Sequence, residues 1–259
     1  MIDGHTHLEN GPLTKEYCYQ MIDGAIAKGI DELHILDHTH RFKEFAPLYE
    51  KLRINNPQIN WLNNDLKDSI YDYINLIEEM KKETLPIKVE FGLEVCYTIG
   101  DEQLLKELLS IYKFDFLIGS VHSVFNVAYD SSWSVEELWN KYPTDDIYKE
   151  YFKTMFSLVE SDLFDQIGHP DTIKMFSFFP SFDLTNSWNK LAKLCIKHNV
   201  KVENNVGCYY RYKYPDKGLA DNVLKIFKDN GCQMITVSDA HYPKDVGSYI
   251  EDIWNKTMY

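Results

Sequence analysis

The sequence has few cysteines, no long apolar run and little positive charge, and each shortage excludes a class of protein. Its five cysteines are widely spaced without a C-x-x-C pair, which argues against a disulfide framework and against a thiolate zinc site. Lys and Arg number 27 against 40 Asp and Glu, so the formal net charge is -13. Most of such a surface would repel a nucleic-acid backbone, and we expect no nucleic-acid partner.

The chain also lacks any stretch long and apolar enough to span a membrane, and residues 1–10 are polar rather than a basic and apolar leader. We therefore expect a cytoplasmic protein without a membrane partner. No fixed-period repeat, low-complexity tract or Gly/Ser linker marks a boundary, which predicts a single domain over residues 1–259. The apolar content of 44% is that of a globular chain.

Short apolar runs alternate with longer amphipathic stretches. The predicted strands are 1–5, 32–38, 87–95, 114–122, 164–170, 200–205 and 234–240. The predicted helices are 15–29, 66–83, 101–112, 145–162, 187–199 and 219–231, two of which end on the glycines Gly29 and Gly231. Repeated strand–helix–strand units imply right-handed crossovers and a parallel sheet, and seven strands favour a barrel of the α/β class.

Metal-ligating residue types stand where the predicted strands end. They are His5 and His7, Asp37 and His38, Glu94, His122, His169, Glu203 and Asn204, and Asp239 and His241. The C-terminal ends of the strands form the active-site rim of a parallel α/β barrel. Counting His40, seven of the nine histidines lie at or just past such ends, and independent structural histidines have no reason to share one rim.

Imidazoles with carboxylates and without thiolates form the ligand set expected for zinc, iron or manganese. The spacing of His5 and His7 suits this use, because alternate residues of a strand face the same side. Three histidines stand apart from the predicted centre. His34 is expected to be hydrogen-bonded in the core, and His198 closes a helix where a cation favours the dipole. His40 could be a ligand, a proton donor or a surface residue.

Taken together, six stretches resemble the polymerase and histidinol phosphatase (PHP) family of metal-dependent phosphoesterases, and within it the bacterial histidinol-phosphate phosphatases. They are DGHTH (3–7), LDH (36–38), FGLEV (91–95), GSVHS (119–123), IGHPD (167–171) and SDAH (238–241). Their order runs through nearly the whole chain. The resemblance implies a distorted seven-stranded TIM-like (β/α) barrel with a cluster of two or three divalent ions, of zinc, manganese or iron.

The resemblance also implies an assignment of ligands. His5, His7, Glu94 and Asp239 look like the ligands of the first metal. Glu94 would bridge to a second metal completed by His122 and His169, and His38 and His241 would hold a third. Many family members carry another histidine soon after the first motif, where this chain has only Glu9 and Asn10, so the ligands completing the third site stay open among Glu9, Asn10, His40 or none. Cys96 stands where many relatives have an acid.

A multinuclear site with a bridging carboxylate suits phosphomonoester hydrolysis, with hydroxide held by the metals attacking phosphorus in line. The substrate implied by the resemblance is L-histidinol phosphate, in histidine biosynthesis. Arg211 is the preferred phosphate ligand, because guanidinium can bind two oxygens, although it could equally be a surface arginine. Asn204 could orient substrate or cap its strand. Acidic loop residues such as Asp130 could meet the amine of histidinol, but the spacing selects none.

Two other functions compete with this reading. One is another PHP-type esterase, acting on a sugar phosphate, phosphotyrosine or a nucleic-acid end, although the acidic balance weighs against the last. The other is a barrel that binds metal without catalysis, which would typically have lost several ligands, whereas nearly all remain here. The sequence gives no oligomeric state and no general acid.

Overall fold

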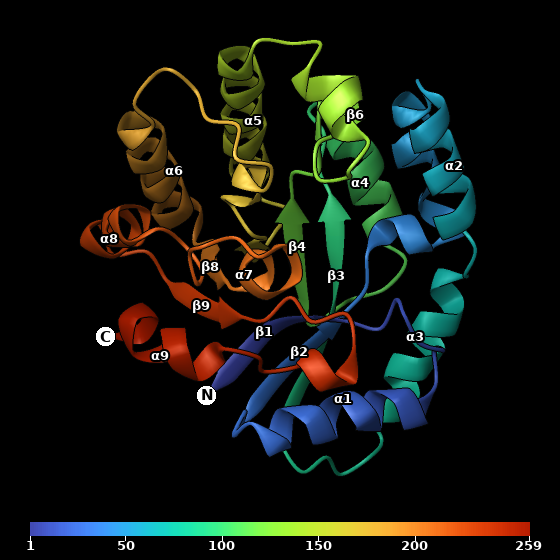
Figure 1. The fold of residues 1–259 in the computed structure, drawn as a ribbon. Coiled ribbons are helices and arrows are strands. Elements are labelled where there is room, and N and C mark those ends of the chain that lie inside the picture. Colours follow the sequence, from blue (N-terminus) through green and yellow to red (C-terminus); the bar gives the residue numbers. More distant parts are fainter.

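A sheet of seven parallel strands lies at the centre of the computed structural model, which describes residues 1–259 (Figure 1). In spatial order the strands are β1 (Ile2–His7), β2 (Glu32–Leu36), β3 (Lys88–Cys96), β4 (Phe116–Ser120), β7 (Gln166–Ile167), β8 (Lys201–Asn205) and β9 (Met234–Val237). Every neighbouring pair in this order is parallel. All seven predicted strands are present, most of them shorter than predicted.

The two edge strands of this sheet also meet. The N–H of His7 donates to the carbonyl of Ala240 at 2.7 Å, and the N–H of Asp239 donates to the carbonyl of His5 at 3.0 Å. The sheet is thus nearly closed into a barrel, which confirms the predicted fold class. Because all strands are parallel, their C-terminal ends open on one mouth of the barrel.

Helices surround the barrel (Figure 1). They are α1 (Lys15–Ala27), α2 (Asn56–Asp65), α3 (Ile70–Met80), α4 (Glu102–Leu109), α5 (Thr144–Glu160), α6 (Thr185–His198), α7 (Gly207–Tyr212), α8 (Asp221–Asn230) and α9 (Ile250–Met258). Short helical turns are η1 (Thr39–Arg41), η2 (Lys43–Leu52), η3 (Val135–Trp139), η4 (Thr172–Lys174) and η5 (Pro243–Asp245). The six predicted helices correspond to α1, α3, α4, α5, α6 and α8, whereas α2, α7 and α9 were not predicted.

The main apolar core fills the space between strands and helices. In α3 the buried residues Ile70, Tyr73, Ile77 and Met80 recur at intervals of three and four, so one face of the helix packs on the barrel. A separate apolar cluster of Leu36, Phe116 and Ile118 lies on the strand faces that also carry His34 and Glu94. It therefore fills the barrel between its two polar ends. None of the helices is both long and apolar enough to cross a membrane.

Candidate metal centre

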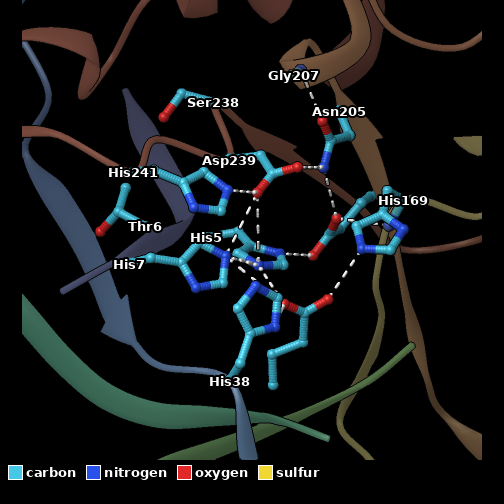
Figure 2. Close-up of polar contacts among 12 residues, drawn as sticks. His5, Thr6, His7, His38, His169, Asn205, Gly207, Ser238, Asp239 and His241 are labelled. Atoms are coloured by element: carbon cyan, nitrogen blue, oxygen red, sulfur yellow. Dashed lines mark hydrogen bonds and ion pairs between the residues drawn. The ribbon is translucent and has the colours of Figure 1, made fainter. Parts of the chain in front are cut away.

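His5 and His7 project from β1 into the C-terminal mouth of the barrel (Figure 2). Both side chains are fully buried, and their Nε2 atoms lie 2.9 Å apart. Thr6, between them, faces the other way and donates its hydroxyl to the carbonyl of His34. The strand alternation predicted from the sequence thus brings both imidazoles to one point.

Glu94 from β3 and Asp239 from the segment after β9 complete this first group of donors. Glu94 Oε2 lies 3.3 Å from His5 Nε2 and 3.5 Å from His7 Nε2. Asp239 Oδ1 lies 3.9 Å and 3.3 Å from the same two nitrogens. Ligand atoms held about 2.0–2.1 Å from one tetrahedral ion lie roughly 3.3–3.4 Å apart. The distances among the donors around His5 and His7, 2.9–3.9 Å, lie on either side of this spacing, so a divalent ion can draw them together.

The other oxygen of Glu94 belongs to a second group of donors. Oε1 lies 3.2 Å from His122 Nε2 and 2.9 Å from His169 Nε2, and these two nitrogens are 3.2 Å apart. The adjacent Gly168 is required for this approach, because a Cβ there would lie 2.1 Å from the hydroxyl oxygen of Ser120. Glu94 thus presents one oxygen to each group, which is the geometry of a bridging carboxylate.

A third group of donors forms around His38, Glu9 and His241, with His7 alongside. Figure 2 shows the three imidazoles of this group. His38 Nε2 lies 3.5 Å from Glu9 Oε2, and His241 Nδ1 contacts Glu9 Oε1. His38 also reaches Glu94, because its Nδ1 is 2.8 Å from Oε2, the oxygen that faces the first group. Of the residues that the sequence left open for this site, Glu9 is therefore the one that lies among the donors.

The other two residues considered for the third group do not reach it. Asn10 donates its amide to the carbonyl of His241, so it supports the loop. His40 stacks on the outer face of His38 with ring centroids 4.3 Å apart, and its Nε2 lies 3.8 Å from Asp65. Cys96 is buried and lines the cavity beside His122. These side chains surround the donors without adding to them.

Glu203, which the sequence placed at the rim without a role, and Asn205, which was not predicted, hold the donors in place. Glu203 accepts from His5 Nδ1 at 2.7 Å, from the N–H of His169 at 2.7 Å and from Gln166 at 2.7 Å. Asn205 donates to Glu203 at 3.1 Å and to Asp239 Oδ2 at 3.3 Å (Figure 2). A carboxylate behind a ligating imidazole fixes the tautomer and orientation of the ring. Glu203 therefore orients His5 so that Nε2 faces the first group.

The prediction that Asn204 binds substrate is wrong. Its side chain is buried away from the mouth, donating to the hydroxyl of Thr257 at 2.7 Å and accepting from the N–H of Leu219 at 2.7 Å. The reason is strand alternation: Glu203 and Asn205 face the barrel interior, so the residue between them faces outward. The signal was in the sequence, because Glu203 stands at the same strand end.

Arg211, on α7, lies at the edge of the third group. Its Nη1 is 3.4 Å from Asp239 Oδ1 and contacts His241 Nε2. The guanidinium also lines the cavity above the donors, together with Tyr212. Arg211 is thus where a cation for an incoming anion was expected, rather than on the outer surface of a loop.

The charges of the cluster shift the pKa values of its members. Burial raises the pKa of the Glu94 carboxyl, but the neighbouring His38, His5 and His122 outweigh burial and hold it well below its usual range. Burial acts to lower the pKa of His5, but the charges of Glu203 and Glu94 outweigh burial and raise this pKa well above its usual value. The pKa of His7 is lowered by burial and by the neighbouring His38 and His241. Glu94 is therefore ionised and ready to bind a cation.

Two of the donor residues have left-handed backbones, which side chains other than glycine rarely adopt. His169 has φ of 25° and Asp239 has φ of 56°. Such conformations cost about 1–3 kcal/mol each and concentrate at functional sites.

His34 and His198 lie outside the metal centre, as predicted. His34 is hydrogen-bonded to Glu32 at 3.0 Å inside the barrel, and His198 ends α6 and is hydrogen-bonded to Asp162 at 2.6 Å.

A parallel α/β barrel with histidine and carboxylate donors converging at its C-terminal mouth defines the class of metal-dependent barrel hydrolases. Within that class, a family model described as the PHP domain matches residues 3–207. The chain therefore belongs to the PHP family.

Curated relatives are similar over most of the chain. A probable histidinol-phosphatase from Deinococcus radiodurans is 25% identical over 186 residues, covering 71% of this chain and 70% of the relative. A probable histidinol-phosphatase from Schizosaccharomyces pombe is 25% identical over 246 residues, covering 88% and 76%.

Two solved structures share the fold. The histidinol phosphate phosphatase of Lactococcus lactis, in complex with zinc, L-histidinol and phosphate, superposes with a TM-score of 0.70 at 17% identity, over 100% of this chain and 94% of that one. A putative histidinol phosphatase from Listeria monocytogenes superposes with a TM-score of 0.71 at 16% identity, over 97% and 99%.

Proposed function

We propose that this protein is a metal-dependent phosphomonoesterase that hydrolyses L-histidinol phosphate to L-histidinol and phosphate. The observation that carries the proposal is the bridging position of Glu94, with one oxygen toward His5 and His7 and the other 2.9 Å from His169. Two adjacent ions bridged by a carboxylate suit phosphoester hydrolysis. The substrate is supported by the relatives, which are named probable histidinol-phosphatases, and by the fold shared with an enzyme in complex with L-histidinol and phosphate.

The proposed ligands follow the three donor groups. His5, His7, Glu94 and Asp239 would hold the first divalent ion, and Glu94, His122 and His169 the second. His38 and His241 would hold a third ion, with Glu9 completing its site. Imidazole and carboxylate donors suit zinc, manganese or iron. Bound ions would neutralise phosphate oxygens and lower the pKa of water at the site.

The chain's own residues have distinct parts in this hydrolysis. Arg211 would bind the phosphate, because its guanidinium lies beside the third group and can donate to two oxygens at once. Asp239 accepts from Asn205 through Oδ2, which leaves Oδ1 directed at the imidazoles. Glu203 fixes His5 in turn. These contacts hold the donors before substrate arrives, so little reorganisation is needed during the reaction.

The test is phosphate release from L-histidinol phosphate by protein loaded with zinc, manganese or iron. A panel of a sugar phosphate, phosphotyrosine and a nucleic-acid 3′-end, at equal concentration, serves as the comparison. We expect kcat/KM for L-histidinol phosphate to exceed that for every other compound. Equal, weak hydrolysis of the whole panel would overturn the substrate and keep the phosphoesterase, and no hydrolysis with metals bound would overturn both.

A further inference from the structure

A cavity of about 280 Å³ opens above the metal centre and extends beyond it. On the inner side it is lined by His38, His122, His241 and Arg211. Trp61, Asp65 and Asp130 also line it, and we call these three residues the outer wall. The cavity is near the lower size limit of small-molecule sites, which begins at about 300 Å³. A phosphate held by the inner side would direct its ester group toward the outer wall.

The outer wall is built from two elements that one buried residue joins. Trp61 and Asp65 are four residues apart on α2, so they share one face of the helix. Asp130 follows the hairpin of β5 (Ser123–Val124) and β6 (Val127–Ala128). Gln58 of α2 is fully buried, donates to the carbonyl of Asn126 at 2.8 Å and accepts from the N–H of Ala128 at 3.0 Å. The helix and the hairpin are therefore held together.

The hairpin is also tied to the metal centre. The N–H of Tyr129 donates to the carbonyl of His122 at 3.1 Å, and the next residue is Asp130. Asp130 additionally lines a smaller space of about 70 Å³ beside His169 and Asp239. The outer wall thus has a fixed position relative to the donors, which a residue that discriminates between substrates requires.

The two carboxylates of the outer wall have no lysine or arginine as ion-pair partner. Asp65 pairs with His40, whose Nε2 lies 3.8 Å away, and Asp130 forms no ion pair. Lys67 also lines the cavity, and its charge acts on Asp65 without forming an ion pair with it. Asp65 is also the last residue of α2, where the helix dipole disfavours a negative charge. Partial burial, and then the charge of Glu9, raise the pKa of Asp65. Both carboxylates would gain from a bound cation.

We propose that Asp65 and Asp130 bind the ammonium group of the departing amino alcohol, with Trp61 supplying an apolar face for the rest of it. This inference rests on the proposed phosphomonoesterase and names the feature of the substrate that the enzyme selects, a primary amine on the alcohol. Arg211, Asp65 and Asp130 all line this cavity, so one site offers a cation for the phosphate and carboxylates for the ammonium group.

The test compares L-histidinol phosphate with its analogue that lacks the amine. The measured quantity is the ratio of the two kcat/KM values, for wild type, Asp65→Asn and Asp130→Asn. A hydrogen bond to a charged group contributes enough that each substitution should lower this ratio by about 10- to 100-fold. Asp72→Asn is the matched control, because Asp72 lies on the exposed first turn of α3 and lines a neighbouring open groove instead. We expect it to keep the wild-type ratio.

An unchanged ratio in both variants would overturn the inference. If both substrates also lose activity equally in a variant, the carboxylate only supports the fold. Failure of the proposed function gives a different result, namely a metal-loaded wild type that hydrolyses neither compound. In that case calorimetric binding of L-histidinol and of the alcohol without the amine decides. Tighter binding of L-histidinol that is lost in the two variants supports the inference, and equal binding overturns it.

Discussion

Two clusters of histidine and carboxylate lie at opposite ends of the same barrel, and only one of them has the properties of a metal centre. At the C-terminal mouth, His5, His7, Glu94 and Asp239 converge. At the other end, His34 Nε2 lies 3.0 Å from Glu32 Oε1 and 3.3 Å from Glu90 Oε2. The apolar cluster of Leu36, Phe116 and Ile118 separates the two.

The two clusters differ in whether a lysine or arginine already balances the negative charge of their carboxylates. Lys88 lies 2.9 Å from Glu32 and 2.7 Å from Glu90, so its ammonium satisfies both carboxylates of the cluster around His34, which we call the lower cluster. Those carboxylates are also partly exposed to water, whereas Glu94 is buried without a lysine or arginine partner. A buried carboxylate is expensive unless protonated imidazoles or a bound cation compensate its charge. Proximity of histidine and carboxylate therefore does not by itself indicate a metal site.

The largest expected effect comes from replacing, one at a time, the two glutamates that β3 places at the two ends of the barrel, Glu94 at the mouth and Glu90 beside His34. Glu94→Gln should remove the bridging carboxylate. Removing a residue that only orients a metal ligand costs roughly 10- to 100-fold in activity, and we expect a larger loss here. Glu90→Gln, four residues earlier on β3, should leave metal content and turnover unchanged. Elemental analysis and phosphate release measure both. A fully metal-loaded, active Glu94→Gln protein would contradict the bridging assignment.

The next effect concerns the residue behind His5. Glu203→Gln should keep the fold but weaken binding at the first site by about 10- to 100-fold, because the imidazole loses the carboxylate that orients it. Glu32→Gln is the corresponding change behind His34, and we expect it to leave metal affinity untouched. Competition with a chelator measures the affinity of each variant. Equal affinities for the two variants would remove the distinction between the two ends.

Acidification should sharpen the comparison further. In the metal-free protein, burial opposes protonation of His5 and His122, but carboxylate charges prevail and raise both pKa values. A metal must displace those protons, so affinity should fall as pH decreases through these raised values, by about tenfold per pH unit for each proton displaced. Calorimetry in buffers of different ionisation enthalpy measures the protons released. Binding that releases none at neutral pH would contradict the direction of these shifts.

The smallest effect is expected at the lower cluster itself. His34→Leu removes the hydrogen bond to Glu32 and the contact with Glu90, and both carboxylates remain paired with Lys88, so the free energy of unfolding should fall by only about 1 kcal/mol. Urea unfolding of the metal-free protein measures this, and metal content should stay at the wild-type level. A loss of bound metal in this variant would show that the lower cluster also binds an ion.

The sequence predicted most of the centre because strand ends and strand alternation are local properties. The eight residues proposed as ligands from the motifs all lie among the donors. Glu9 could not be selected, because its approach to His38 and His241 depends on how the loop after β1 folds back. Asn204 faces outward because Glu203 and Asn205, its neighbours on β8, both face the barrel interior.

The outer wall shows what the sequence could not supply. The segment that forms α2 is polar, and its apolar residues are too few to predict a helix, although Asn55 caps it by accepting from the N–H of Gln58. Asp65 and Asp130 are distant in sequence and meet at one cavity only because Gln58 joins helix and hairpin. No local pattern reports such a contact.

The closure of the barrel between β1 and β9 also determines when the first metal site can form during synthesis. His5 lies on the first strand and Asp239 follows the last, and the hydrogen bond between their backbones forms only when both strands are in place. During synthesis, the earlier strands emerge long before β9, so the first metal site cannot assemble until β9 and Asp239 have left the ribosome. Metal loading at that site would therefore report a closed barrel, and chains terminated before β9 would not retain the ion.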